Sequence, residues 1–284
     1  MYNLRRDNED VSTPKKIHKL VINSLVKKDI RSWEEMESQG RLANLSHTDY
    51  SCTMEHLKNG KLSDRLVQFI VKARLQIAET NVLLQKMYPE TYGKCCKICK
   101  NPYDTISHVL NGCMEFKLNY TQRHNRIVDI VFEAVHKYNQ TIVLYKEKIV
   151  IVNLISDDNE LQIIDYFRTV NARKPDLFLI DYALKKCFII EISVPFDTFI
   201  NDCYEGKFQK YVPLFELLAL SGYDAKIIVL IVGSLGHVHK RFTSGLKMLG
   251  IPNSVAKSLA KYASVSAMIG SHIIWRKRGQ ILMK

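Results

Sequence analysis

The sequence predicts an α/β protein of the α+β type, in which a mixed sheet flanked by helices follows a helical segment and a small cysteine-rich unit. Short runs rich in β-branched and aromatic residues occupy 142–154, 174–182 and 186–195. Helix patterns at 121–138 and 202–220 lie before and after these runs, and a buried-looking strand at 226–232 leads into further helices. This order is typical of a mixed sheet covered by helices.

The composition is that of a folded globular protein. Apolar residues make up 46% and charged residues 25% of the 284 residues, which excludes wholesale disorder and collagen-like or low-complexity chains. The longest apolar runs are far shorter than the roughly 20 residues that cross a bilayer, so no membrane-spanning segment is expected. The length predicts about two domains.

Residues 1–90 are predicted to be mostly helical. Between 61 and 90, apolar residues recur at helical spacing with lysine and arginine between them, as in one or two helices that pack one face on a core. This stripe consists of Leu62, Leu66, Ile70, Leu75, Ile77, Val82, Leu83 and Leu84.

A set of metal-binding residue types follows at 91–116. Cys96 and Cys99 are separated by two residues, His108 follows after eight more, and Cys113 after another four. Zinc takes four such sulfur and nitrogen ligands, two of them from one tight C-x2-C turn. We therefore predict a closed, structural zinc site. Cys95 in place of Cys96 remains an alternative, and so do free buried cysteines without a metal.

The remaining cysteines are isolated in sequence. Residues 1–10 are polar and lack the apolar stretch of a secretion signal, so all seven cysteines are expected in a reducing compartment. Metal binding is therefore the favoured interpretation of the cluster, and disulfides are not expected. Cys52, Cys187 and Cys203 are interpreted as ordinary packing residues.

Two carboxylates are predicted to face each other across a hairpin. The β-rich runs flank residues 182–185, and if the turn centres on Ala183 and Leu184, Asp176 lies directly opposite Glu191 on the neighbouring strand. A slip of one residue in the turn would move Glu191 to the other face, so the pairing depends on the register.

Glu191 is the one charged residue in an otherwise apolar strand, where an ionised carboxylate is costly unless it is paired or binds a metal. Magnesium held between Asp176 and Glu191 would remove their repulsion and supply a Lewis acid. The alternative is that Asp176 caps a turn and Glu191 pairs with Lys174 or Lys186.

On the helix that follows, Lys207, Lys210 and Tyr211 share one face, which favours a lysine near the carboxylates. Solvent-facing lysines remain the alternative.

Basic charge is concentrated near the C-terminus. Residues 225–284 hold ten lysines and arginines and no acid, whereas 1–224 hold 31 basic and 29 acidic residues. Such a segment attracts polyanions, with nucleic acid as the first candidate partner and an acidic membrane surface as the second. A solvated basic surface is the alternative. Trp275 with Arg276, Lys277 and Arg278 has the composition of a nucleic-acid contact.

Residues Gly233–Gly236 are predicted to connect the strand at 226–232 to the next helix. His237 and His239 follow this connection and are expected to be exposed.

These residues resemble a known family. Lys174-Pro175-Asp176, followed by Glu191, is similar to the PD-(D/E)xK nucleases, in the version carried by site-specific non-LTR retrotransposons. Those polyproteins place a Cys-Cys-His-Cys knuckle before the nuclease and a basic-histidine pair on its first helix, here Arg123 and His124. Residues 33–40 and 61–90 resemble the segment between the reverse transcriptase thumb and the knuckle. The resemblance implies three parts: a linker at 1–90, a zinc knuckle at 91–116 and a restriction-like endonuclease domain at 117–284.

The family implies a nuclear, metal-dependent endonuclease that nicks target DNA and leaves a 3′-hydroxyl to prime reverse transcription. Carried over, Asp176 and Glu191 hold magnesium or manganese, the main chain of Ile192 adds a ligand, and Lys207 or Lys210 is the catalytic lysine. Arg123, His124 and residues 276–278 contact DNA, with RNA as a further candidate partner.

The sequence departs from the family pattern in two respects. Ser193 occupies the usual lysine position, so the lysine must come from the following helix. No Tyr/Phe-x-Asp-Asp polymerase motif occurs, so the chain is expected to be the C-terminal part of such a polyprotein, or a gene derived from one, without reverse transcriptase activity. A catalytically inactive zinc-knuckle protein that binds nucleic acid is the alternative function.

Overall fold

The computed structural model describes residues 14–37, 39–43, 45–58, 62–139, 143–146, 149–152, 161–164 and 174–283. Two compact units divide the chain, Met1–Asn44 and Leu45–Lys284. The first unit contains helix α1 (Pro14–Glu34), and the chain then turns back on the end of this helix. Gly40 is required there, because a Cβ atom would lie 2.3 Å from the carbonyl oxygen of Trp33.

The second unit begins with three short helices, α2 (Tyr50–Lys58), α3 (Asp64–Arg74) and α4 (Asn81–Met87). The predicted apolar stripe at 61–90 therefore forms two helices. They are separated at Gln76, which adopts a left-handed φ of 56°, and α4 is capped by the Thr80 hydroxyl. Helix α3 buries Leu66, Phe69 and Ile70. The cysteine-rich segment follows, with a π-helix η1 (His108–Gly112) and a short helix η2 (Met114–Phe116).

The predicted mixed sheet is confirmed. It contains β1 (Val143–Lys146), β4 (Leu177–Asp181), β5 (Lys186–Ser193) and β6 (Asp224–Ile231), in the order β1-β4-β5-β6. The first two pairings are antiparallel, and β5 and β6 are parallel. Strands β2 (Ile149–Val152) and β3 (Leu161–Ile164) form a separate antiparallel pair. The parallel pair requires a crossover, which helix α6 supplies.

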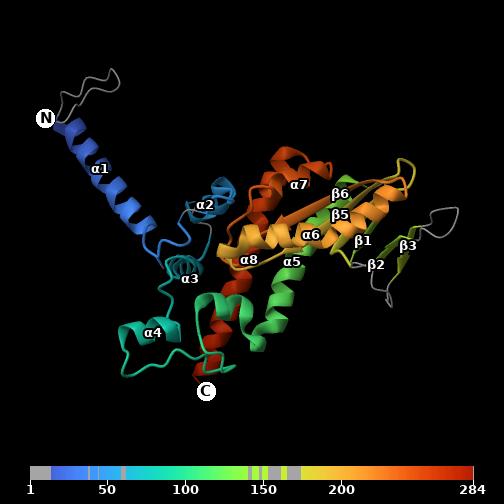
Figure 1. Cartoon of the computed structure of the whole chain (residues 1–284). Helices are drawn as coiled ribbons and strands as arrows, with labels where there is room; N and C mark the ends of the chain where they lie inside the picture. Colours follow the sequence, from blue (N-terminus) through green and yellow to red (C-terminus); the bar gives the residue numbers. More distant parts are fainter. Residues whose placement is uncertain are drawn as a thin grey trace. The chain divides into compact units, whose positions relative to one another are not determined.

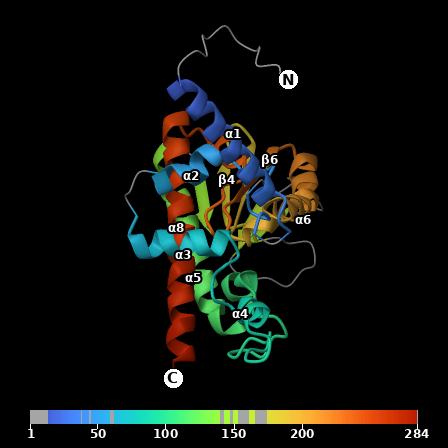
Figure 2. The ribbon, with the colours of Figure 1, turned by 90° about the vertical axis from the view of Figure 1, so that its left-hand side faces the viewer.

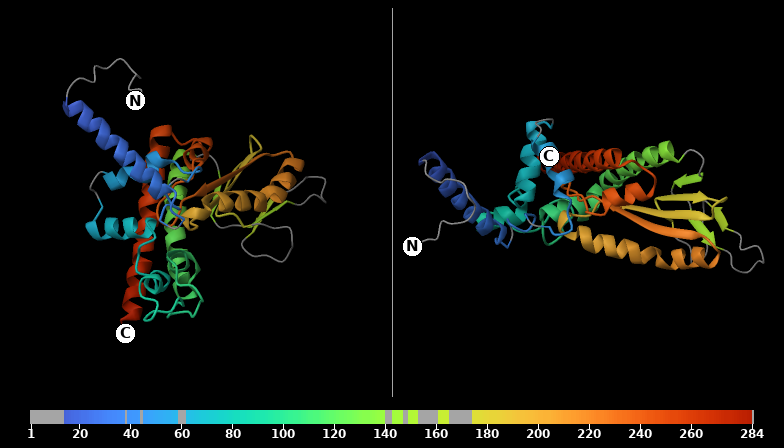
Figure 3. Two further views of the ribbon diagram at one scale, coloured as in Figure 1. Left: turned by 60° about the vertical axis from the view of Figure 1, so that its left-hand side comes forward. Right: turned by 90° about the horizontal axis from the view of Figure 1, so that it is seen from above.

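Helices cover both faces of the four-stranded sheet (Figure 1). Helix α6 (Ile200–Leu220) lies on one face, and α5 (Lys117–Tyr138), α7 (Phe242–Met248) and α8 (Asn253–Leu282) lie on the other, as the view from above in Figure 3 shows. Helices α5 and α8 run side by side (Figure 2). Because side chains alternate along a strand, Ile190 and Ile192 of β5 face α5 and α8, whereas Ile189 and Glu191 face α6.

The register of the β4–β5 hairpin is the predicted one. Leu177 pairs with Ile190 and Asp181 with Lys186, so the turn centres on Ala183 and Leu184. Lys185 closes the turn with a left-handed φ of 49°. The observed pairing ends at Leu177 and Ile190, one residue short of Asp176 and Glu191, so the placement of the two carboxylates opposite each other stays a prediction.

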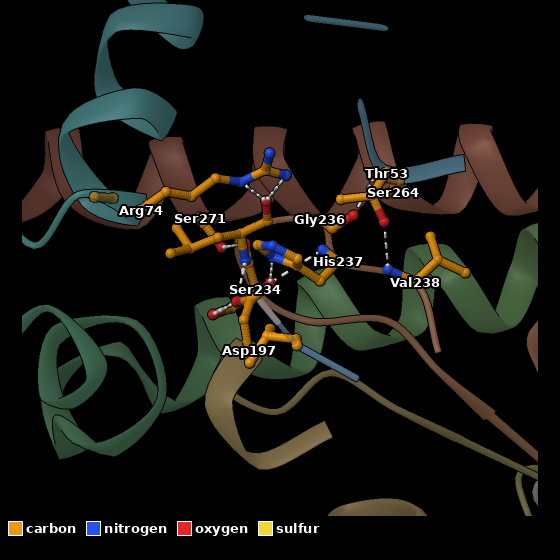
Figure 4. Close-up of polar contacts among 12 residues, drawn as sticks. Thr53, Arg74, Asp197, Ser234, Gly236, His237, Val238, Ser264 and Ser271 are labelled. Carbon is orange, nitrogen blue, oxygen red and sulfur yellow. Dashed lines mark hydrogen bonds and ion pairs between the residues drawn. The ribbon is translucent and has the colours of Figure 1, made fainter. Parts of the chain in front are cut away.

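The loop after β6 is buried, contrary to the expectation that its histidines are exposed. His237 and His239 are 2% and 1% exposed, because His237 folds against the carboxylate of Asp197 and His239 stacks on the ring of Tyr204. Asp197 accepts hydrogen bonds from the main-chain N–H groups of Leu235 and His237 and from His237 Nδ1 (2.7 Å), as Figure 4 shows. The predicted role of Gly233–Gly236 as a connection between strand and helix is confirmed.

The two compact units do not coincide with the boundaries predicted at 90 and 116. The cysteine-rich segment and the sheet with its helices belong to one unit, Leu45–Lys284. Within this unit, the Arg278 guanidinium of α8 donates to the Asp104 carboxylate of the cysteine-rich segment at 2.5 Å. This bond is one of the contacts that join the segment to the helices of the sheet. Among the described residues, no helix has the length and apolar character to cross a membrane.

Candidate functional site

The four predicted metal ligands converge. The ligand atoms of Cys96, Cys99, His108 and Cys113 all lie within 4.8 Å of one another, and Cys99 Sγ is 3.3 Å from His108 Nε2. Three sulfurs and one imidazole nitrogen at such separations form a donor set that can hold a metal such as zinc. Among the described residues, this is the group in which three or more metal-binding side chains come together.

The choice between Cys95 and Cys96 is resolved by the local backbone. Cys96 is 1% exposed and belongs to the cluster, whereas Cys95 is exposed on the other side of the chain. The N–H of Cys96 donates to the carbonyl of Asn101, and the N–H of Lys100 donates to the carbonyl of Cys96. Lys100 adopts a left-handed φ of 64°, which tightens the turn that places Cys96 and Cys99 on one side.

Glu191 is held by three side chains of helix α6. Its Oε1 accepts hydrogen bonds from Lys207 Nζ at 2.5 Å and Lys210 Nζ at 3.3 Å, and its Oε2 accepts one from the hydroxyl of Tyr211 at 2.6 Å. The Glu191 side chain is only 4% exposed. A buried carboxylate is costly without partners, and α6 supplies them in place of the Lys174 and Lys186 pairings considered from the sequence.

Asp176 lies at the end of the sheet. The residue immediately precedes β4, and its Oδ2 accepts a hydrogen bond from the main-chain N–H of Ile192 at 2.7 Å. Because such N–H groups point along a sheet and not out of its faces, this bond places the Asp176 carboxylate in the plane of the sheet. It therefore lies beside the strand that carries Glu191 and is open to groups from both faces.

Lys207 lies in the field of both carboxylates. Burial disfavours its charge, but the hydrogen bond to Glu191 and the charges of Glu191 and Asp176 outweigh this effect and raise the pKa of Lys207. Lys207 is therefore an ammonium at neutral pH. Lys210 is farther from Glu191 and also donates to the Tyr211 hydroxyl at 2.9 Å. Of the two predicted lysines, Lys207 is thus the one closer to the acidic pair.

His124 reaches the same site from helix α5. Its Nε2 lies 3.4 Å from Asp176 Oδ2 and 3.1 Å from the carbonyl oxygen of Ile192, which requires a proton on that nitrogen. Burial lowers the pKa of His124, but the hydrogen bond and charge of Asp176 reverse this effect and raise the pKa to about 9. A histidinium next to Asp176 and an ammonium next to Glu191 therefore neutralise the acidic pair.

Two of the predicted nucleic-acid contacts are buried in the structure. Arg123 is 2% exposed and donates a hydrogen bond to Ser271 Oγ at 2.8 Å. The aliphatic part of the Arg123 side chain packs against Gly270 of α8, where a Cβ atom would lie 2.6 Å from Arg123 Cγ. Arg278 is 6% exposed and binds Asp104. These two arginines join elements of the fold, so the prediction that they present charge at the surface is corrected. Arg276 is exposed, and half-buried Lys277 donates to Asn119.

Sequence reasoning missed the role of Tyr211. Its helix face was identified, but its hydroxyl is fully buried between Glu191 and the carbonyl of Lys174, which is 2.9 Å away. Periodicity gives a helix face and not the contact made across the fold. The available signal was the tyrosine hydroxyl on the same helix face as Lys207 and Lys210, which could have indicated a third partner for Glu191. Comparisons of the sequence with protein-family models and with the curated proteins find no match.

Proposed function

We propose that this chain is a metal-dependent endonuclease that nicks DNA by phosphodiester hydrolysis, related to the PD-(D/E)xK nucleases of site-specific non-LTR retrotransposons. The observation that carries the proposal is the environment of Glu191. An acid in the middle of an apolar strand is held by two lysines and a tyrosine, and a second acid, Asp176, accepts a hydrogen bond from the main-chain N–H of the next residue, Ile192. Lys207 and His124 at this place both have a raised pKa, and titratable groups perturbed by specific charged partners are typical of functional sites.

The donor set fits a divalent cation. Asp176 and Glu191 offer two carboxylates, and the carbonyl of Ile192 lies in the same place, 3.1 Å from His124 Nε2. Oxygen ligands of this kind suit magnesium or manganese, which keep waters and phosphate oxygens in their remaining positions. When bound, such an ion supplies a Lewis acid and lowers the pKa of a bound water.

The side chains around Asp176 and Glu191 have different roles in the proposed reaction. Because Lys207 has a raised pKa, it acts as a fixed positive charge that stabilises the phosphate during the reaction and not as a base. His124 neutralises Asp176, and a cation held by Asp176 would take over this role. Tyr211 and Lys210 fix the orientation of Glu191.

The test is a nicking assay with supercoiled plasmid and Mg²⁺. Wild type is expected to produce nicked circles, and Asp176→Asn and Glu191→Gln are expected to slow this by about 100-fold or more, since each removes a charged group from the site. Asp181→Asn is the matched control, because Asp181 lies at the other end of β4 and its side chain accepts a turn hydrogen bond from the N–H of Leu184. Equal rates for Asp176→Asn and wild type would refute the proposed site.

A second candidate function is nucleic-acid binding without cleavage, and the exposed surface of the cysteine-rich segment favours it. Tyr88 and Tyr103 are more than half exposed, Tyr88 and Tyr92 lie ring to ring, and Lys97 lies over the Tyr92 ring. Aromatic rings with lysines are suited to stacking on bases and contacting phosphates of DNA or RNA. Wild type that binds DNA but yields no nicked circles above the Asp176→Asn background would establish this alternative. Either function on chromosomal DNA implies a nuclear protein.

A further inference from the structure

A hydrogen bond joins the metal-binding cluster to the strand that carries Glu191. Asn111 lies in η1, between the ligands His108 and Cys113, and its Nδ2 donates to the carbonyl oxygen of Val194 at 2.8 Å. Val194 follows β5 directly and comes three residues after Glu191. The cluster therefore contacts the end of the strand at which the acidic pair lies.

A second route ends on the same carbonyl. The N–H of Cys113 donates to the hydroxyl of Tyr120, whose ring lies 5.5 Å from the guanidinium of Arg123. Arg123 in turn donates to the carbonyl of Val194 at 3.4 Å. Two of the four metal ligands are thus linked to Val194, one through η1 and Asn111 and one through Tyr120 and Arg123.

The second route also reaches Asp176 through helix α5. Arg123 precedes His124 in helix α5, and His124 contacts both Asp176 and the carbonyl of Ile192. A shift of the start of α5 would therefore move a group that touches Asp176. A shift of Val194 would move the strand end that binds Asp176 through the N–H of Ile192.

These links are partly withdrawn from water. The carbonyl of Val194, which is 8% exposed, accepts a buried hydrogen bond from Arg123 and a part-buried one from Asn111. On its other side the segment is anchored by Asp104, which accepts from Arg278 and from the N–H of Asn81. A segment that served only as a surface grip for a ligand would not require bonds to the end of β5.

We propose that the metal-loaded cysteine cluster positions the acidic site, with Asn111 as the positioning residue that holds Val194 and thereby the end of β5. The inference rests on the proposed function and adds a positioning residue to it. The bond from Asn111 to Val194 sets the rate of hydrolysis at Asp176 and Glu191, although the cluster itself touches neither substrate nor reacting atoms.

The experiment compares Asn111→Ala with wild type as full-length, zinc-loaded chains. The variant is expected to keep one zinc per chain and the wild-type affinity for DNA, and to nick plasmid roughly tenfold more slowly at saturating DNA, the effect typical of losing a group that orients a site. Hydrogen exchange of the amides at 190–196 is expected to be faster in the variant. Asn101→Ala is the control, since Asn101 lies in the same segment and, within the described part of the chain, its side chain accepts a hydrogen bond from the N–H of Tyr103 and makes none to Val194.

Two results would overturn the inference. One is wild-type nicking by Asn111→Ala, and the other is unchanged exchange at 190–196. If wild type itself does not nick, the proposed function fails, and the exchange measurement alone decides whether the cluster holds the strand end. Asn111→Asp keeps the shape and removes the donor, and it replaces the alanine variant if that variant does not fold.

Discussion

At the scale of single residues, His239 makes the stability of the fold depend on pH. Its ring is 1% exposed and stacks on Tyr204 at 4.5 Å, and its Nδ1 accepts the main-chain N–H of Arg241. Burial, helped by the positive groups His47, Arg241 and Lys240, lowers the pKa of His239 to about 4. The unfolded chain takes up this proton near pH 6.5, so the free energy of unfolding falls as the pH drops from 6.5 towards 4.

The expected loss from this one group is about 2 kcal/mol between pH 7 and pH 5. His239→Phe keeps a ring against Tyr204 but cannot take up a proton, so its stability should fall less over the same interval. Urea unfolding at the two pH values measures the difference. Identical pH dependence in wild type and variant would show that His239 is not the group responsible.

The surroundings of Glu191 could be predicted in part from sequence because each signal was local. Glu191 stood out as a charge in an apolar strand, and Lys207 followed from helix periodicity. The pairing of Asp176 with Glu191 stays a prediction, because the observed strand pairing ends at Leu177 and Ile190. Arg123 and Arg278 were misjudged for the opposite reason. Whether an arginine faces solvent or is buried between two helices depends on how distant segments pack together. The composition of a segment carries no information about this packing.

At the scale of the elements, the turn of the cysteine-rich segment gives two neighbouring cysteines different surroundings. Cys96 points into the cluster and Cys95 is exposed, so Cys95→Ser should retain one zinc per chain and Cys99→Ser should lose it. Metal analysis of the purified variants measures this directly. Loss of zinc in Cys95→Ser with retention in Cys96→Ser would reverse the assignment of the ligands.

Helix α8 contains two glycines with opposite surroundings. A Cβ atom at Gly270 would lie 2.6 Å from Cγ of Arg123, whereas one at Gly279 would meet nothing within 4 Å. Gly270→Ala should therefore destabilise the fold by about 1–3 kcal/mol through overpacking, and Gly279→Ala should be neutral or stabilising by up to about 1 kcal/mol. Chemical denaturation measures both. A neutral Gly270→Ala would contradict the close packing of α5 and α8.

Most elements followed from sequence patterns. The helix predicted at 202–220 is α6, the strand predicted at 226–232 is β6, and the hairpin has the predicted register. The π-helix at His108–Gly112 was not predictable, because it depends on contacts with Val194 and Tyr120 from other parts of the chain.

At the scale of the whole molecule, the basic C-terminal region contains charges with two different roles. Arg276 is exposed and Lys277 half-buried, whereas Arg278 is buried against Asp104. Replacing both Arg276 and Lys277 by alanine should weaken DNA binding and reduce the slope of log K against log salt by about 2, since each phosphate contact contributes about 0.9. Binding measured at several salt concentrations tests this. An unchanged slope would exclude these two side chains from the interface.

Arg278→Ala is the contrasting variant. Because it leaves Asp104 buried without its partner, it should lower the free energy of unfolding by about 3–5 kcal/mol. The salt dependence of DNA binding by the folded fraction should not change.

The central claim is that the end of the sheet binds a divalent cation between two carboxylates. The location of Mn²⁺ in crystals of the chain with duplex DNA, found by anomalous scattering, tests it most directly. We predict a peak within about 2.5 Å of carboxylate oxygens of both Asp176 and Glu191, with His124 displaced from Asp176. Mn²⁺ bound elsewhere, with Asp176 still paired to His124 and Glu191 to Lys207, would contradict the account.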